Sequence, residues 1–440
     1  MDIGQLLQNP VKVISDLLTQ LLGGLGLAPQ AVALILQVIG VVLIASFCLL
    51  LPLFLIWFER RVVARMQDRV GPNRVGPQGL LQTIADAIKL LIKEDITPIG
   101  ADKLVYNLAP IVSVVAVISM WAVIPFASSI VGTSLNVGVL YIISVGSLGT
   151  LAIMMAGWSS NNKYALLGAF RTVSQLVSYE APLLLSLLIP VLLARSMDMN
   201  TIVAQQHVWY IVAAPIAAVI FFVTSVAEVG RTPFDLLEAE SEIVAGFHIE
   251  YSGMKFGMFF VAEFLHAFTV GALTAILFLG GWRGPWVEQV PLLGVIYFML
   301  KAFAGYFIVI LMRTTLPRIR IDHMLDLNWK FLVPLSLAVI VVTMLGDKGM
   351  EAAGLTDAWV RGGLLFLLNV VLAAVTYWLL SATARRMRAA EAAALEAQDA
   401  VPGGHDGHGD DHGHGHDDGG HGAHSEPAHG EHGPAAAAAH

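Results

Sequence analysis

The most regular feature of this sequence is a series of long apolar runs separated by polar segments. Several runs reach the roughly 20 residues that an α-helix needs to cross a bilayer. A helix satisfies its own backbone hydrogen bonds, which the hydrocarbon interior demands. A β-barrel would instead show alternating segments of about 10 residues, and the sequence has none. The runs predict an all-α, polytopic membrane helix bundle with about nine transmembrane helices: Ala31–Trp57, Leu104–Phe126, Val137–Ala156, Leu166–Leu193, Trp209–Val226, Phe256–Gly280, Pro291–Met312, Phe331–Leu345 and Gly363–Leu380.

Two different segments flank these spans. Before the first span, apolar residues recur at the spacing of a helix that lies on the membrane surface: Leu7, Val11, Ile14, Leu18 and Leu21. After the last span the chain becomes rich in Glu and Ala and then in Gly, His and Asp, which argues for disorder. We therefore expect an amphipathic amino-terminal segment, a transmembrane domain and a cytoplasmic His/Asp/Gly-rich disordered tail at residues 1–30, 31–382 and 383–440.

The tail holds ten of the 14 histidines, all between His405 and His440. Imidazole suits zinc, copper and nickel, so metal capture is one interpretation. A solvated tail with incidental metal affinity is the other, and composition alone favours it.

Composition supports the membrane interpretation. Hydrophobic residues make up 56% of the 440 and charged residues 13%, against about 25% charged in soluble domains. The one cysteine, Cys48, lies inside an apolar run. This excludes a disulfide within the chain, and it also excludes an iron–sulfur cluster or zinc site that the chain's own cysteines would hold.

The basic residues predict the orientation in the membrane. With Lys301 inside a span, 19 of the 25 lysines and arginines fall in segments on one side and five on the other. The positive-inside rule places the richer side in the cytoplasm. The amino terminus is therefore expected outside and the carboxyl-terminal tail in the cytoplasm.

The first long cytoplasmic segment covers residues 59–103. It repeats Arg-Val-Gly-Pro at 69–72 and 74–77, and such Gly-Pro steps indicate fixed turns. Residues 80–92 then place apolar side chains at helical spacing and keep Asp86 off that stripe. The pattern predicts an amphipathic helix docked against the membrane or a partner, and a simple interfacial anchor is the alternative.

The second segment, 227–255, is acidic. Thr232-Pro233-Phe234-Asp235 has the residue types of a helix start. In that helix Asp235, Glu238 and Glu242 share one face, whereas Glu240 points elsewhere. A solvated acidic face is the ordinary explanation, but the spans lie close on both sides and apolar residues alternate with the acids. Acids crowded in apolar surroundings can exchange protons near neutral pH.

Other charges lie in a third segment and within the spans. Positive-inside anchoring explains the arginines that begin at Arg313 on charge alone. Ionisable groups at membrane depth are costly, so the four within spans are functional candidates: Glu180, Glu263, His266 and Lys301. Glu263-x-x-His266 matches one half of a di-iron site, but no second copy exists. We therefore expect no metal site.

The residues alone leave two classes of function open. One is an ion-coupled secondary transporter with a buried acidic pathway, a class that commonly shows two repeated halves. No internal repeat of that size is present. The other is a component of a redox-driven proton pump, which needs a large charged cytoplasmic face to dock a redox partner.

At this point the loop motifs become informative. The chain resembles the H subunit of respiratory complex I, the proton-translocating NADH:quinone oxidoreductase, from about Val41 to Leu380. The resemblance rests on four segments: Glu59-Arg-Arg followed by Arg69-Val-Gly-Pro-Asn-Arg-Val-Gly-Pro-Gln-Gly-Leu-Leu-Gln and Ala85-Asp86-Ala-Ile-Lys89, Gly168-Ala-Phe-Arg171 with Ser178-Tyr179-Glu180, Ala227-Glu228 with Arg231-Thr-Pro-Phe-Asp235 to Glu242, and Arg313 with Pro317-Arg318, Arg320 and Asp322.

The resemblance implies a role at the junction of the hydrophilic and membrane arms, in the bacterial inner membrane. Quinone would be the substrate, and other subunits would hold the flavin and the iron–sulfur clusters. No nucleic acid partner, metal site or complete active site is expected. By motif, the quinone chamber would be lined by Arg60, Asp86, Arg313 and Arg318. The proton path would contain Glu180, Glu228, Glu238, Glu240, Glu242 and Glu263, to which their positions add Asp235 and Lys301.

A paralogous subunit of a membrane-bound hydrogenase, or of a ferredoxin- or F420-linked dehydrogenase, shares parts of these loops and is the alternative within the same class. The complete Arg-Val-Gly-Pro repeat and the arginines of the chamber favour complex I.

Overall fold

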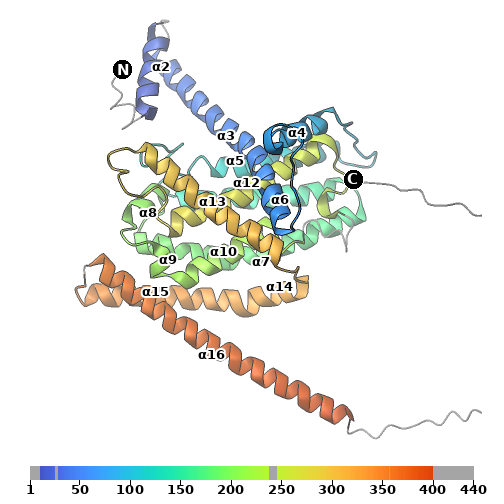
Figure 1. The fold of residues 1–440 in the computed structure, drawn as a ribbon, viewed down its shortest axis with the longest axis vertical. Coiled ribbons are helices and arrows are strands. Elements are labelled where there is room, and N and C mark those ends of the chain that lie inside the picture. The colour runs from blue at the N-terminus through green and yellow to red at the C-terminus, as the bar shows by residue number, and fades with distance from the viewer. Residues whose placement is uncertain (1–9, 25–27, 237–244, 356, 400–440) are drawn as a thin grey trace, which may run out of the picture. The chain divides into compact units, whose positions relative to one another are not determined.

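The structure is a computed structural model that describes residues 10–24, 28–236, 245–355 and 357–399 (Figure 1). Its regular elements are helices. The long helices are α3 (Pro29–Met66), α5 (Lys103–Met120), α6 (Gly138–Ser159), α7 (Lys163–Ala194), α12 (Gly253–Phe278), α13 (Leu292–Thr315), α15 (Val333–Ala352) and α16 (Ala358–Asp399). The shorter ones are α2 (Pro10–Gly24), η1 (Pro77–Gly79), α4 (Gln82–Ile92), α8 (Met199–Gln205), α9 (Tyr210–Ala213), α10 (Pro215–Val229), η2 (Gly246–His248), α14 (Ile321–Leu327) and η3 (Asn328–Leu332).

Within these residues, eight helical segments are long and apolar enough to cross a membrane. The predicted span Phe331–Leu345 belongs to a much longer helical segment, 321–352. The predicted span Trp209–Val226 is instead divided into α9 and the 15-residue α10. Proline has no backbone N–H to donate, so it begins a helix more readily than it continues one, and α10 starts at Pro215. The polytopic all-α prediction is confirmed.

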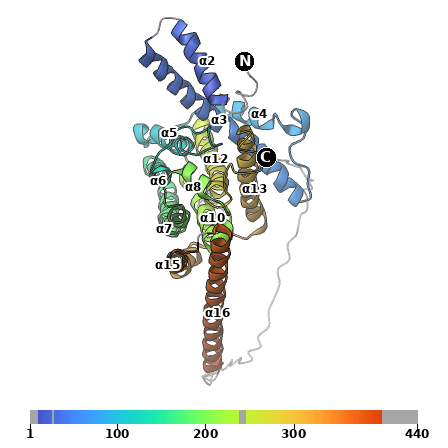
Figure 2. The same cartoon turned by 90° about the vertical axis from the view of Figure 1, so that its left-hand side faces the viewer.

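Helix α12 forms the centre of the bundle. Of its most apolar 18 residues, 72% are buried, and it packs against α5, α10 and α13. Figure 2 shows α12 between α5 and α13. Gly271 and Gly305 let α12 and α13 approach closely, because a Cβ on Gly271 would lie 2.4 Å from the carbonyl oxygen of Ala302. This contact fixes the position of Glu263, the one acid of α12, relative to the polar residues of α13.

Local sequence signals explain several of the helix ends. The Asp102 carboxylate accepts hydrogen bonds from the first turn of α5, and the Asn162 side chain does the same for α7. Gly230 ends α10 in the left-handed conformation at φ +72°, which glycine adopts without strain. The turn at Gly230 directs Arg231 back into the bundle, where it is buried.

Two predicted surface elements are helical. The amphipathic helix expected at 80–92 is α4, which packs against α3 and α12. The amino-terminal segment contains α2. Helix α16 continues to Asp399, so residues 383–399, which the sequence assigned to the tail, are helical. Their Ala, Glu and Leu content favours a helix, and residues 400–440 lie outside the described part of the chain.

The predicted helix starting at Thr232 is wrong for the described residues 232–236, which form a turn, a bend and irregular backbone. Tertiary contacts replace the helical hydrogen bonds. The Gln175 amide donates to the carbonyl oxygens of Ala227 at 2.7 Å and Phe234 at 2.8 Å, and Ile319 N–H donates to the Pro233 carbonyl at 3.0 Å. Burial of Phe234 and Leu236 outweighs the local capping preference. The remainder of that predicted acidic helix lies outside the described residues.

Candidate functional site

A cavity of about 790 Å³ opens where the end of α3 meets α12 and α13. Apolar side chains such as Ile56, Phe260 and Phe264 form part of its wall. Arg60 and Arg313 line it as well, together with Glu59. The cavity therefore combines an apolar surface with one carboxylate and three guanidinium groups, those of Arg60, Arg313 and Arg69. This is the usual composition of a site for a largely apolar ligand with a polar end.

Glu59 is the centre of a buried hydrogen-bond network at this cavity. Its side chain is only 7% exposed. It accepts hydrogen bonds from Arg231 Nη1 at 3.2 Å, from the Tyr306 hydroxyl at 2.8 Å, and from Arg313 Nη1. Three donors from two separate segments, the turn after α10 and helix α13, converge on one carboxylate. Such a buried, fully hydrogen-bonded group holds its partners in fixed positions.

Arg231 extends the network from the cavity into the bundle. Its Nε lies 3.0 Å from Glu263 Oε1, and its guanidinium lies 4.5 Å from the centre of the Phe264 ring. Its side chain is 4% exposed, so its positive charge is compensated by the carboxylates of Glu59 and Glu263 rather than by water. Arg231 thus connects a carboxylate on the cavity wall with a carboxylate of α12.

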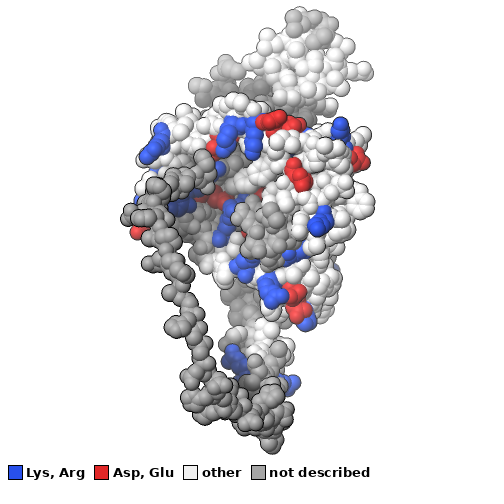
Figure 3. All heavy atoms as spheres, turned by 90° about the vertical axis from the view of Figure 1, so that its right-hand side faces the viewer, with Lys and Arg blue, Asp and Glu red and all other residues white. Residues whose placement is uncertain are grey.

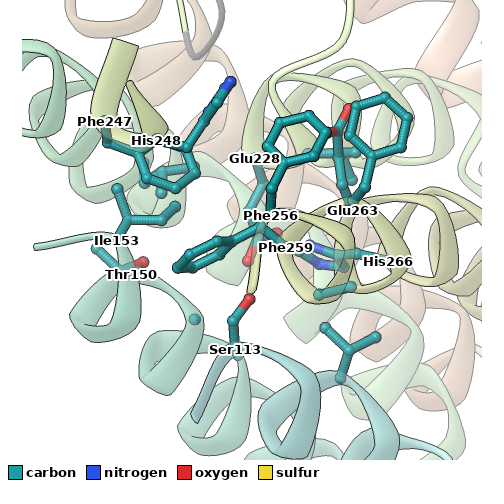
Figure 4. Close-up of a pocket in the computed structure, with 17 residues that line it drawn as sticks. Ser113, Thr150, Ile153, Glu228, Phe247, His248, Phe256, Phe259, Glu263 and His266 are labelled. Atoms are coloured by element: carbon teal, nitrogen blue, oxygen red, sulfur yellow. The ribbon is translucent and has the colours of Figure 1, made fainter. Parts of the chain in front are cut away.

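Beyond Glu263 lies a second, smaller cavity of about 80 Å³ (Figure 4). It is lined by four ionisable side chains, which are Glu228, His248, Glu263 and His266. Its volume is enough for a few water molecules, since one needs about 10–15 Å³ measured in this way. Burial lowers the pKa of His248 to about 4, so this imidazole is neutral at pH 7 and can both donate and accept a hydrogen bond.

Two further acids influence the residues of this cavity through their charge. The charge of Glu180 acts on Glu228, and the charge of Asp235 acts on Glu263. α7, which carries Glu180, packs directly against α10, which carries Glu228. Four acids from the sequence prediction are thus brought together on adjacent elements.

At the edge of the larger cavity, Arg60 also forms an ion pair with Asp86 of α4, with 2.6 Å between Nη1 and Oδ2. Burial raises the pKa of Asp86, but the hydrogen bond and charge of Arg60 outweigh that effect, so its pKa lies below the ordinary value. The carboxylate is therefore ionised throughout the physiological range. Asp86 ties α4 to the cavity wall through Arg60.

Comparison with known proteins agrees with this geometry. Residues 39–344 match the family profile described as NADH dehydrogenase. The chain belongs to this family.

Family members named as the H subunit of NADH-quinone oxidoreductase are similar over most of their length. The one from Dehalococcoides mccartyi is 53% identical over 302 residues, 69% of this chain and 84% of the relative. That from Brevibacillus brevis is 46% identical over 70% of this chain and 91% of the relative. The first of the numbered H subunits of Geobacter metallireducens is 45% identical over 72% of this chain and 98% of the relative.

The remaining predicted site residues do not lie at the two cavities or are outside the described part of the chain. Arg318 is half-buried after α13 and does not line the 790 Å³ cavity. Lys301 donates to the carbonyl oxygens of Gly281 and Arg283, each at 2.9 Å. It lies 12 residues before Arg313 on α13, or about 18 Å along the helix, and is not brought to the acids. Glu238, Glu240 and Glu242 lie outside the described residues.

Three residues of the site were missed by the sequence reasoning as site residues: Glu59, Tyr306 and Arg231. Glu59 is included in the sequence prediction only within the Glu59-Arg-Arg motif. Its position as an acid at the end of an apolar run is the signal that could have identified it. Neither the charge nor the sequence position of Arg231 indicates a site residue. Its inward direction follows from the turn at Gly230, which is visible only in the structure. Tyr306 lies in an apolar span, where a tyrosine is ordinarily a packing residue. Among the described residues, no group of three His, Cys, Asp or Glu side chains is placed to hold a metal ion.

Proposed function

We propose that the chain is the membrane component of a proton-translocating NADH:quinone oxidoreductase that forms the quinone chamber and the first part of a proton path. The names of its relatives and the family match support this assignment over a hydrogenase or a ferredoxin- or F420-linked dehydrogenase. The observation that carries the proposal is the Glu59 network. It joins an open cavity lined by three arginines to an internal cavity lined by acids.

The chemistry of the larger cavity suits a quinone. Its apolar wall would accept the ring and tail, and reduction places negative charge on the ring oxygens. Arg60 and Arg313 are positioned to stabilise that charge, and stabilisation is strongest where the donors are already fixed. Glu59 and Asp86 fix these two arginines.

The same network relates the charge on the quinone to the acids. New negative charge beside Arg313 competes with Glu59 for the Arg313 guanidinium. The pairing of Glu59 with Arg231 then changes, and so does the pairing of Arg231 with Glu263. Glu263 shares the small cavity with Glu228, which feels Glu180. We therefore propose the order Glu59, Arg231, Glu263, Glu228, Glu180 for the path, with Asp235 beside Glu263. Lys301, Glu238, Glu240 and Glu242 stay predictions without geometric support.

The partner surface is proposed on the segment between α3 and α5. Large apolar side chains stand exposed there, among them Val70 at 80%, Ile92 at 79% and Ile99 at 103%. Apolar groups of this size, set among charges, mark protein contacts. Figure 3 shows one face of the molecule on which lysines, arginines and acids gather. Subunits of a hydrophilic arm are the proposed partners of this segment.

A functional test compares two acceptors in membranes that contain the whole complex. Arg313→Ala is expected to lower quinone reductase activity roughly fivefold, because Arg313 is one-third exposed and Arg60 persists beside it. Oxidation of NADH by a soluble artificial acceptor, which takes electrons upstream, should not change. Asp86→Asn leaves both arginines in place, so it should raise the KM for quinone two- to threefold, the range expected for a partly exposed ion pair. Equal loss of both activities in Arg313→Ala would contradict the assignment.

The proposed orientation can be tested at the two ends of the candidate span Ala358–Arg386. Native Cys48 is fully buried, so it should react poorly with a membrane-impermeant maleimide. In sealed right-side-out vesicles we expect labelling of Asp357→Cys and no labelling of Arg385→Cys, whereas inverted vesicles should give the reverse. Both residues are exposed. Labelling of Arg385→Cys from the outside would overturn the orientation.

A further inference from the structure

We propose a binding site for an anionic phospholipid on the lipid-facing side of α3, separate from the quinone cavity. The site is a groove of about 500 Å³ between the last turns of α3 and α13, called here the interfacial groove. It is lined by Trp57, Phe58, Arg61, Val62, Arg65, Met66, Gln78 and Phe307. Arg60, which directly precedes Arg61 on α3, lines the proposed quinone cavity and not this groove.

The floor of the interfacial groove is apolar and aromatic. Phe58 and Phe307 line it, and just below it Phe54 and Phe303 continue the aromatic surface, with ring centres 5.9 Å apart. Phe307 is 38% exposed and Phe54 41% exposed, although both belong to membrane-spanning helices. An acyl chain is the apolar partner available to such a surface within a bilayer.

The cytoplasmic end of the interfacial groove is basic. Arg61 and Arg65 are four residues apart on α3, so they lie on the same side of the helix. Both also line an adjoining cavity of about 210 Å³, which contains Arg69 and one acid, Asp68. Among the described residues, neither Arg61 nor Arg65 forms an ion pair with a carboxylate. Two arginines without anionic partners beside an apolar floor are complementary to a phosphate that carries acyl chains.

Arg61 is held in position for such a ligand. Its Nη1 donates to the backbone oxygen of Gln78 at 3.1 Å and to the Gln78 side-chain oxygen at 2.9 Å. Its guanidinium lies 5.5 Å from the centre of the Trp57 ring, and the Trp57 indole N–H also donates to the Gln78 carbonyl at 3.2 Å. Ordering the side chain in advance reduces the entropy lost on binding.

The position along α3 agrees with a headgroup site. Trp57 belongs to the type of residue that gathers at the membrane–water boundary, and the arginines follow within the next two turns. Basic residues directly cytoplasmic of a span attract anionic lipids. The interfacial groove thus places apolar contacts on the membrane side and two cations on the headgroup side.

The test uses the whole complex in nanodiscs and a phosphatidylglycerol that carries a photoactivatable acyl chain. Cross-links should map to residues 54–66 and 303–310. They should exceed those of the matching phosphatidylcholine probe about 25-fold, because that probe carries no net charge for the two arginines to attract. Arg61→Gln should lower labelling about fivefold and Arg61→Gln with Arg65→Gln about 25-fold, since each basic residue near the surface contributes roughly a fivefold change in partition.

The matched control is Lys163→Gln, which removes a cation that lies over the ring of Tyr164 at the start of another spanning helix. It should leave the cross-links at the interfacial groove unchanged. Four results would each overturn the proposal: equal labelling by phosphatidylcholine, displacement by excess inorganic phosphate, displacement by added quinone, or equal loss in Lys163→Gln. The first indicates a general apolar surface, the next two indicate a free-anion or quinone site, and the last indicates an effect of overall charge.

Discussion

Glu59→Gln is expected to lower quinone reduction about a hundredfold while NADH oxidation by a soluble artificial acceptor stays normal. The glutamine keeps the size of the side chain but leaves Arg231 and Arg313 without their shared carboxylate. Arg313 and Arg231 then both lose their fixed positions, so the cavity wall and the connection to Glu263 are disturbed together. The effect is therefore larger than that of removing Arg313 alone, and a displacement of about 1 Å can cost two orders of magnitude in rate. The comparison of the two acceptors in purified complex measures this.

Removing one partner of a buried ion pair costs about 3–5 kcal/mol, so assembly must be checked alongside activity. The double variant Glu59→Gln with Arg313→Gln restores the charge balance and should recover assembly if the single variant loses it. Glu351→Gln is the matched control, because it removes a carboxylate that pairs with Arg195 at the other end of the bundle. Normal quinone reduction in an assembled Glu59→Gln complex would show that the network has no role in the site.

Glu228→Gln is expected to slow quinone reduction and proton translocation together, by about tenfold or more, the range for loss of a positioned proton-transfer group. Glu228 and Glu263 line one small cavity, and Glu180 and Asp235 act on them. Like charges in such surroundings disfavour one another's ionised forms, so a carboxyl group at this position is suited to take up and release a proton. Glutamine cannot take up or release that proton.

Proton uptake and quinone reduction should be measured on the same reconstituted complex after its subunit content is confirmed. Asp326→Asn is the matched control, because it removes an exposed carboxylate that pairs with Lys330. An assembled Glu228→Gln complex with wild-type turnover and wild-type proton uptake would contradict a role of Glu228 in coupling quinone reduction to proton translocation. Loss of the assembled complex would instead show that Glu228 serves in packing.

The sequence predicts the spans well because membrane helices are selected by one dominant property, the length of an apolar run. It fails where backbone groups find tertiary partners. The residues Thr232 to Asp235 have good helix-start chemistry, but Gln175 and Ile319 take up the nearby backbone hydrogen bonds. Trp209–Val226 read as one continuous span, and the structure divides it at Pro215.

For the site too, the sequence identifies some residues, and the contacts between them depend on the tertiary structure. Arg60, Asp86, Arg313, Glu228 and Glu263 could be selected by motif and by charge at membrane depth. What no pattern along the chain could show is which of them touch. Glu59, Arg231 and Tyr306 come from segments more than 70 residues apart in sequence, and they meet only because α12 and α13 pack closely and Gly230 turns the chain inward. Lys301 had the expected residue type, and it lies about 18 Å along α13 from Arg313.

The central claim is that the cavity beside Glu59 holds the quinone. Photoaffinity labelling of the whole complex with an azido-quinone, followed by peptide mapping, tests this most directly. The label should fall on residues that line the cavity, in segments 56–72, 260–264 and 313–314, and excess unlabelled quinone should remove it. Labelling of this chain confined to other segments, or insensitive to excess quinone, would contradict the account.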